Sequence, residues 1–314
     1  MTDIKLKRNS ILTLKQNSYS TIKIYLFLIG IAFSLPIRAQ DNIPVTIKGK
    51  LNADINNETS GLAASSVNKG LLYIHNDSGD TSRFFLIGTD GTLKAIYTFK
   101  ANPLIKNGVT DCEDIAVSTG PKEKSYVYIG DIGDNNAKRK NITVYRIKEP
   151  KLKSSTKLFA GHKNADPLYM KYPDGARDAE TLMVDPVEKL FYIISKREDS
   201  VSVYTAPLLF KPNDTVTLIQ RCTLFFEGGN NGKWISGGNI SKDGSQVLVK
   251  SYLNVFYWKR KNKEPLWQLL MTPPRKMPYK LEQQGEAIDF AAKGNGYYTI
   301  SEGVHPEVYY YEIE

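Results

Sequence analysis

A short acidic pattern recurs along this 314-residue chain, and the recurrence restricts the folds that the chain can adopt. The clearest copy is Asp111-Cys112-Glu113-Asp114-Ile115-Ala116, in which an apolar residue follows the polar positions. The corresponding apolar anchors of the five copies are separated by steps of 53, 67, 58 and 48 residues, and they are Leu62, Ile115, Leu182, Ile240 and Ile288. Repeats of about 20 to 50 residues or a little more are typical of propellers and solenoids.

Each repeat contains strand-like runs joined by Gly, Pro, Asp or Asn turns, which suit tight hairpins. The second runs cover residues 71–76, 126–131, 190–195, 246–251 and 296–301. Third runs cover residues 83–87, 142–147, 201–206, 254–259 and 307–313, and four repeats have a fourth run, at 93–99, 168–172, 215–226 and 266–271. No amphipathic helix of twelve residues or more is evident after residue 39, and 19 Tyr and 12 Phe favour strands. The sequence therefore predicts an all-β fold.

The last repeat has no fourth run, whereas residues 44–51 form a strand-like segment that belongs to no repeat. If this segment completes the last repeat, the array closes into a ring and exposes no open sheet edge. We therefore predict a five-bladed β-propeller closed by an N-terminal strand. Six blades stay possible if the 67-residue step hides a degenerate blade.

Residues 1–39 resemble an export signal, with basic residues before an apolar run and Arg38-Ala39-Gln40 after it. We predict a signal peptide at 1–39, a single propeller domain at 40–314 and a periplasmic or secreted protein without a transmembrane anchor after cleavage; an uncleaved anchor is the alternative. Removal of this segment lowers the formal charge from +9 to +4, because 36 Lys/Arg and 32 Asp/Glu remain. With no dense basic cluster beyond a short turn at 257–263, no nucleic-acid partner is expected.

In a propeller blade the first strand lies nearest the axis and pairs antiparallel with the second. First-strand starts and second-strand ends should therefore meet at one mouth of the central channel. Crowded carboxylates there favour a bound hard cation, and calcium suits oxygen ligands, whereas three His make zinc a poorer fit. The predicted metal ligands are Glu58, Asp77, Asp111, Glu113, Asp131, Asp178, Glu180 and Glu286.

Other polar residues at the same mouth are candidates for ligand binding or catalysis. His75 could act as a general base or only bond to Asp77, and Lys196 could neutralise the acids or bind an anionic group. The remaining predicted ligand-binding residues are Asn76, Ser195, Lys250, Tyr252 and Glu302. The structural alternative is that each acid only accepts hydrogen bonds from backbone amides of the next blade. In the fourth repeat, aligned on Ile240, Ser236 and Gly238 replace the acids, which predicts an open side of the site.

Several segments resemble a group of uncharacterised secreted bacterial β-propellers, which are distantly similar to phytase-esterase-like and WD-repeat-like propellers. These segments are GLAAS, HNDSGD, DCEDIAV, GDIGDN, DAETLMVDP, SGGNISKDG and QGEAIDF. The phytase-like resemblance implies calcium and phosphate-ester chemistry at an acidic mouth. The residues that match in character are Glu58, Asp111, Glu113, Asp178, Glu180 and Glu286.

Three functional hypotheses follow. The preferred one is an exported propeller whose acidic mouth binds a divalent cation and, through or beside it, a small ligand. The second is a metal-assisted hydrolase of phosphate or carboxylic esters. The third is a non-catalytic protein-interaction scaffold of the cell envelope, favoured if the insert at 159–167 plugs the mouth. A disulfide between Cys112 and Cys222 stays open.

Overall fold

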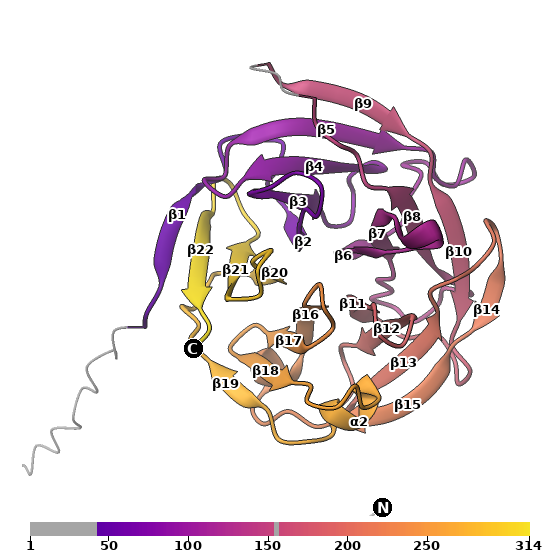
Figure 1. Cartoon of the computed structure of the whole chain (residues 1–314). Coiled ribbons are helices and arrows are strands. Elements are labelled where there is room, and N and C mark those ends of the chain that lie inside the picture. The colour runs from indigo at the N-terminus through magenta and orange to yellow at the C-terminus, as the bar shows by residue number, and fades with distance from the viewer. Residues whose placement is uncertain (1–42, 154–156) are drawn as a thin grey trace, which may run out of the picture. The chain divides into compact units, whose positions relative to one another are not determined.

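The computed structural model describes residues 43–153 and 157–314. These residues form five sheets of mainly antiparallel strands, arranged around a common axis (Figure 1). The predicted signal peptide at 1–39 lies outside the described residues. Within the described part of the chain, no helix has the length and apolar character needed to cross a membrane.

Each blade is a four-stranded antiparallel sheet whose first three strands follow one another in sequence. Blade one contains β2 (Thr59–Ala64), β3 (Leu71–Asn76), β4 (Arg83–Gly88) and β5 (Leu93–Phe99). Blade two contains β6 (Cys112–Thr119), β7 (Ser125–Asp131), β8 (Ile142–Lys148) and β10 (Asp166–Lys171). Blade three contains β11 (Ala179–Asp185), β12 (Leu190–Ser195), β13 (Val201–Pro207) and β15 (Ile219–Leu224).

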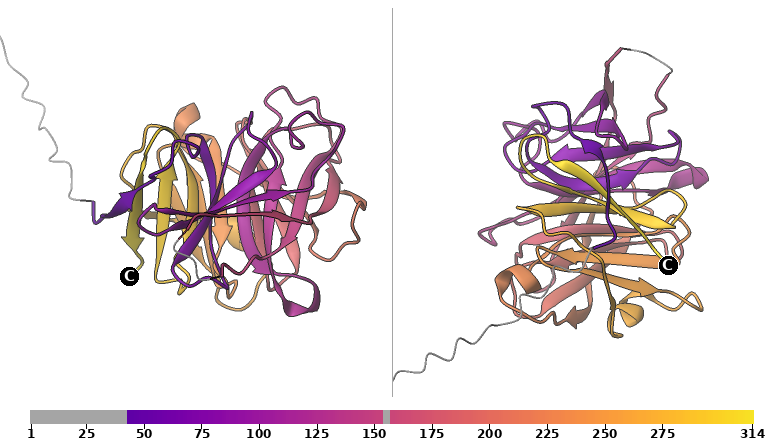
Figure 2. Two further views of the ribbon diagram at one scale, coloured as in Figure 1. Left: turned by 90° about the horizontal axis from the view of Figure 1, so that it is seen from above. Right: turned by 90° about the vertical axis from the view of Figure 1, so that its left-hand side faces the viewer.

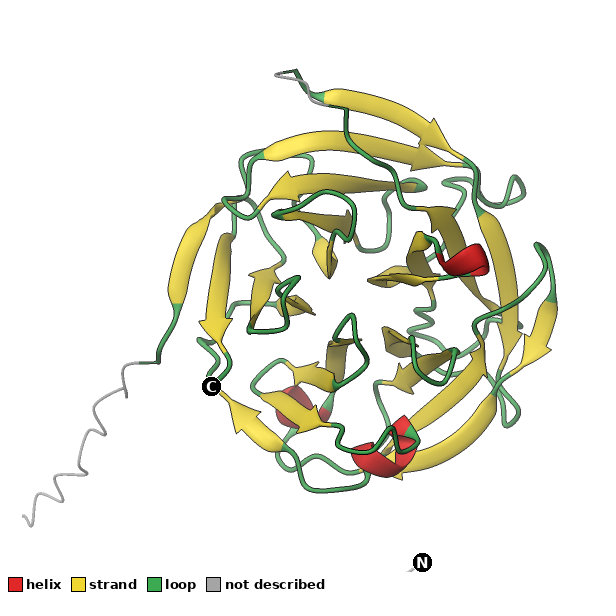
Figure 3. Ribbon diagram, viewed as in Figure 1, coloured by secondary structure: helices red, strands yellow, loops and turns green. Residues whose placement is uncertain are grey.

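The last two blades follow the same plan. Blade four contains β16 (Ile235–Ile240), β17 (Gln246–Ser251), β18 (Val255–Lys259) and β19 (Arg275–Met277). Blade five contains β20 (Gly285–Phe290), β21 (Gly296–Ser301), β22 (Glu307–Glu312) and, from the other end of the chain, β1 (Thr46–Lys50). Helices are confined to the short α1 (Asn230–Lys233), α2 (Leu266–Leu270) and 3-10 turn η1 (Pro121–Glu123) among the described residues (Figure 3).

The N-terminal strand closes the ring as predicted. β1 pairs antiparallel with β22, and the indigo and yellow strands lie side by side in Figures 1 and 2. The inner strands contact one another in the cyclic order β2, β6, β11, β16, β20 and again β2. The described residues thus form five blades, and the six-bladed alternative is wrong.

Three features of the outer strands differ from the sequence-based expectation. Residues 266–270 form helix α2 in place of the expected strand, because Leu266, Leu269 and Leu270 lie at helical spacing and are all buried. The fourth strand of blade four is β19. The run 215–226 divides into β14 (Thr215–Thr217), which pairs parallel with β10 of blade two, and β15 of blade three. The insert between β8 and β10 of blade two forms β9 (Phe159–Lys163), which pairs parallel with β5 at the outer edge of blade one, so it does not plug the mouth.

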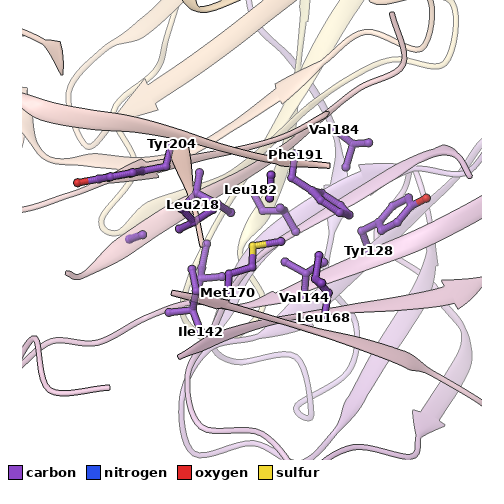
Figure 4. Packing of buried hydrophobic residues seen from close by; sticks show 14 of the residues in the cluster. Tyr128, Ile142, Val144, Leu168, Met170, Leu182, Val184, Phe191, Tyr204 and Leu218 are labelled. Atoms are coloured by element: carbon purple, nitrogen blue, oxygen red, sulfur yellow. The ribbon is translucent and has the colours of Figure 1, made fainter. Parts of the chain in front are cut away.

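Apolar side chains fill the spaces between neighbouring blades. Between blades two and three, Tyr128 packs edge to face against Phe191, with ring centroids 5.3 Å apart (Figure 4). Leu182 of the inner strand is fully buried in the same cluster. Burying each such side chain contributes about 1.5–3 kcal/mol. This packing holds the inner strands rigidly enough to position the polar residues at their ends.

Candidate metal and ligand site

Every inner strand begins with a β-bulge at the same place. The register with the second strand shifts by one residue at the start of all five inner strands, and the unpaired residues are Ser60, Glu113, Glu180, Ser236 and Glu286. A bulge of this kind re-aims a side chain that regular pairing would direct elsewhere. The recurring sequence pattern is therefore the sequence of a repeated bulge.

The bulges correct the predicted alignment of the fourth repeat. Ile235 pairs with Ser251 as Thr59 pairs with Asn76, so Ser236, and not Gly238, occupies the position of the three glutamates. Two residues before the bulge, blades one to three have the acids Glu58, Asp111 and Asp178. The corresponding residue of blade four is Trp234. The alignment on Ile240 was wrong by two residues. In the fourth inner strand Gly238 occupies the position of the apolar anchor, two residues after the bulge, where blade five has Ile288.

The strand pairings confirm that first-strand starts and second-strand ends lie together. Residues at these ends are hydrogen-bonded partners in every blade, for example Cys112 with Asp131 and Ala179 with Ser195. We call this end of the propeller axis the mouth. Three bulge glutamates, Glu113, Glu180 and Glu286, come together there, with one carboxylate oxygen of each within 4.8 Å of the others.

These three glutamates are almost fully buried, with 2%, 3% and 2% of their surface exposed. Oε2 of Glu180 and Oε2 of Glu286 have no hydrogen-bond partner among the described residues. Buried carboxylate oxygens without donors are costly unless a proton or a cation compensates them.

A second group of acids shares Glu113 with the first. Asp77, in the loop after β3, and Asp111, just before β6, each place an oxygen within 4.8 Å of Glu113. Gly133 lies against this group, because a Cβ on it would collide with Oε1 of Glu113 and Oδ2 of Asp111. The absence of a side chain at Gly133 leaves room for the two carboxylates. Oδ1 of Asp111 is buried without a partner among the described residues.

One lysine enters the glutamate group. Lys196 Nζ lies 2.5 Å from Oε1 of Glu180 and donates to Tyr252 Oη at 3.0 Å. Tyr252 in turn donates to Oε1 of Glu286 at 2.6 Å. Lys196 thus neutralises one glutamate and, through Tyr252, orients a second, as the prediction that it balances the acids requires.

Two arginines that the sequence reasoning missed pair with other predicted metal ligands. Arg139 lies 2.7 Å from Asp131, whose oxygens also accept from the amides of Thr110 and Asp111. Arg197 lies 2.5 Å from Asp178. Asp131 and Asp178 do not belong to either close group of acids in the described chain. Arg139 lies between β7 and β8 and Arg197 between β12 and β13, in loops whose sequences do not repeat from blade to blade, so no periodic signal indicated them.

Burial and mutual repulsion raise the pKa values of several acids at the mouth. Burial raises the pKa of Asp77 to about 7, with Asp111 and Glu286 adding to the effect. Burial also raises the pKa of Glu180 to about 8 against the opposing charge of Lys196, and that of Glu302 to about 10 with help from Glu286. The pKa of Glu113 is raised as well, by burial and then by Glu180. Without a cation, the site therefore holds protons near neutral pH.

The other predicted residues hold the loops around the mouth. Asn76 donates to the carbonyl of Ile55 at 2.7 Å, and Ser195 Oγ accepts from the amide of Ser202 at 2.8 Å. Glu58 is exposed, and its backbone carbonyl accepts from the amide of Asp77. These contacts place the three residues at the mouth without bringing their side chains into either close group of acids.

His75 and Lys250 lie at equivalent positions of blades one and four and are both buried. His75 Nδ1 bonds to the carbonyl of Asn76 at 2.8 Å, and its Nε2 lies beside Gly61, buried and unpartnered among the described residues. Burial lowers the pKa of His75 to about 4, so its ring is neutral. Lys250 donates to the carbonyls of Ser251 and Gly285 between blades four and five.

Two acids further from the mouth have the structural role that the sequence analysis gave as the alternative: they accept hydrogen bonds from backbone amides of the next blade. Asp114 accepts from the amide of Leu182 in the next blade at 3.0 Å. Asp289 accepts from the amide of Ala64 at 2.6 Å and thereby joins blade five to blade one. In the Asp111 to Asp114 motif, Glu113 therefore faces the mouth, whereas Asp114 joins neighbouring blades.

The two cysteines are unpaired. Cys112 is buried in the core of blades one and two, and Cys222 lies on β15 of blade three. Burial raises the pKa of Cys112 well above its usual value and that of Cys222 to about 11. The disulfide that the sequence left open is not formed.

Together, the fold and the site define a five-bladed β-propeller with a buried acidic cluster at one end of its axis. No protein-family model matches the chain, and no curated protein is similar to it in sequence. Among solved structures, it is similar to a luciferin-regenerating enzyme, with 14% sequence identity, coverage of 85% of this chain and 94% of that chain, and a TM-score of 0.47.

Proposed function

We propose that the mouth of the propeller binds a divalent cation and, beside it, a small ligand. The observation that carries this proposal is the convergence of the buried Glu113, Glu180 and Glu286, from three different blades, together with Oε2 atoms of Glu180 and Glu286 that have no hydrogen-bond partner among the described residues. Each of the five inner strands has its bulge at the same position, so the ring as a whole directs the bulge residues toward the mouth. A cation would replace the protons that the raised pKa values otherwise require.

The ligand chemistry favours calcium. All the groups that converge are carboxylates, and hard cations prefer such oxygens. Oxygens on opposite sides of a calcium ion are about 4.6–5.2 Å apart, since each bond is about 2.3–2.6 Å long. The oxygens of each group lie within 4.8 Å of one another, so they are close enough for a single ion to contact all three. Zinc is a poorer fit because it prefers His and Cys ligands, and the ring of His75 is directed between the blades.

A shallow cavity at the rim gives room for the small ligand. It has a volume of about 230 Å³, and its lining includes Asn135, Arg177, Asp178 and Arg197. Arg197 also lies over the ring of Trp234, with 5.2 Å between its guanidinium carbon and the centroid. Arg177 pairs with Asp174 and Glu198, and Arg197 pairs with Asp178, so the cavity presents paired charges and an aromatic ring, which favour a compact polar ligand.

The hydrolase and scaffold hypotheses stay predictions. A general base must reach a water or substrate, and Nε2 of His75 is fully buried beside Gly61. Any metal-assisted chemistry at this mouth would therefore depend on a carboxylate such as Asp77 to move a proton. A panel of chromogenic phosphate and carboxylic esters, assayed with and without a chelator, tests that activity; chelator-resistant turnover would exclude a metal-assisted mechanism.

Calorimetric titration of calcium into purified protein tests the preferred proposal. The double variant Glu113→Gln, Glu180→Gln keeps the shape of the site and removes two charges, so we expect affinity to fall by about 100-fold or more. Glu149→Gln is the matched control, since Glu149 is also buried but bonds to Ser65 at the opposite end of the blades. Absence of calcium binding by the native protein, or equal binding by the double variant, would refute the proposal.

A further inference from the structure

The two groups of acids at the mouth have one member in common. Asp77 and Asp111 approach Glu113 from blades one and two, whereas Glu180 and Glu286 approach it from blades three and five. A carboxylate has two oxygens, and Oε1 of Glu113 lies on the side of Asp111, above Gly133. A bridging arrangement requires Oε2 to serve the other group.

The charges at the mouth exceed what one divalent cation can balance. The close acids, with the adjoining Glu302, make six carboxylates, of which Lys196 neutralises one. Arg139 and Arg197 are engaged by Asp131 and Asp178 and do not reduce this excess. If all six carboxylates ionise, five negative charges remain unbalanced, so one divalent cation leaves three and two cations leave one.

Unpartnered oxygens occur in both groups, so each group independently has unused ligand capacity. Asp111, which is 8% exposed, supplies a buried unpartnered oxygen to the first group, and Glu180 and Glu286 supply one each to the second. Gly133 keeps the first group open, since any side chain there would fill the space between Asp111 and Glu113.

We propose that the mouth holds two divalent cations bridged by the carboxylate of Glu113. Asp77 and Asp111 complete the first site, and Glu180 and Glu286 complete the second. This inference rests on the proposed cation binding and adds its number and arrangement. A bridging carboxylate holds two cations about 3.5–4 Å apart, as in other two-metal sites.

Calcium stoichiometry in three variants tests the arrangement. The native protein, expressed from the full chain, should bind two calcium ions in a calorimetric titration. Gly133→Ala should bind one, because the new methyl group displaces the flexible ends of Asp111 and Glu113 and leaves Glu180 and Glu286 in place. Glu180→Gln should also lose one ion, and Glu113→Gln should weaken both by at least tenfold. Circular dichroism and thermal unfolding establish that each variant is folded.

The manganese form supplies a second readout. Two Mn²⁺ ions that share Glu113 should give an exchange-coupled electron paramagnetic resonance spectrum, and Gly133→Ala should give the spectrum of an isolated ion. Binding of a single ion by the native protein would overturn the two-cation inference and leave the proposed function intact. Two ions that are both retained in Gly133→Ala, or two uncoupled ions, would overturn the bridge. No binding at all would overturn both proposals.

Discussion

Replacing Lys196 by methionine should destabilise the protein in a strongly pH-dependent manner. Lys196 is 5% exposed and lies 2.5 Å from Glu180. Burial by itself would lower the pKa of its ammonium group, but the negative charges of Glu180 and Glu286 outweigh that effect and raise the pKa. Methionine keeps most of the side-chain volume and removes the charge. At pH 9, above the pKa of about 8 that Glu180 has beside Lys196, the variant must either leave a buried carboxylate without its cation or take up a proton. Breaking a buried pair in this way costs about 3–5 kcal/mol.

At pH 5 the same substitution should cost only about 1 kcal/mol, the value of a hydrogen bond, because Glu180 holds its proton in the folded protein. The folded pKa of Glu180 is raised above its unfolded value of 4.5, so its contribution to stability is present below pH 4.5 and is lost as the pH rises through 8. Without Lys196 the pKa of Glu180 rises further, so the variant should lose more stability over the same pH range. Each unit of this rise corresponds to about 1.36 kcal/mol.

Urea unfolding followed by tryptophan fluorescence, in the presence of a chelator, measures both free energies. The double variant Lys196→Met, Glu180→Gln is the matched control, and it should regain most of the stability at pH 9 because position 180 then carries no charge that lacks its cation. Equal losses at pH 5 and pH 9 in the single variant, or a double variant as unstable as the single one, would refute the reasoning.

Three further predictions concern the scaffold. Deleting β1 (Thr46–Lys50) should expose the edge of β22 and cause self-association in size-exclusion chromatography; a monomer of unchanged unfolding midpoint would contradict ring closure by this strand. Cys112 and Cys222 should react with a thiol reagent at pH 7 only after urea is added, since burial raises both pKa values; rapid reaction of the native protein would contradict this. Arg260→Met should cost about 3–5 kcal/mol in urea unfolding, because it leaves the fully buried Asp185 without its guanidinium partner at 2.7 Å; a loss below about 1 kcal/mol would contradict a buried ion pair.

Much of the ring could be read from the sequence because its signals are local and repeated. Turn residues and alternating apolar runs mark hairpins, and the unpaired segment at 44–51 predicted the strand that completes blade five. Residues 266–270 were misassigned because a short apolar run has no clear period, and the burial of Leu266, Leu269 and Leu270 on one side of α2 settles the matter only in three dimensions.

The acidic motif by itself determined that carboxylates from several blades meet at one end of the axis. Glu113, Glu180 and Glu286 recur at the same place in their repeats, and antiparallel pairing brings repeated strand ends together. What only the tertiary structure decided is which acids approach one another and which are neutralised. Arg139 and Arg197 reach the mouth from loops, and the strand pairing shows that Ser236, and not Gly238, is the fourth-blade equivalent of the bulge glutamates. Contacts between distant loops leave no periodic trace in a sequence, and the register of the fourth inner strand could not be read from its apolar anchor because glycine stands at that position.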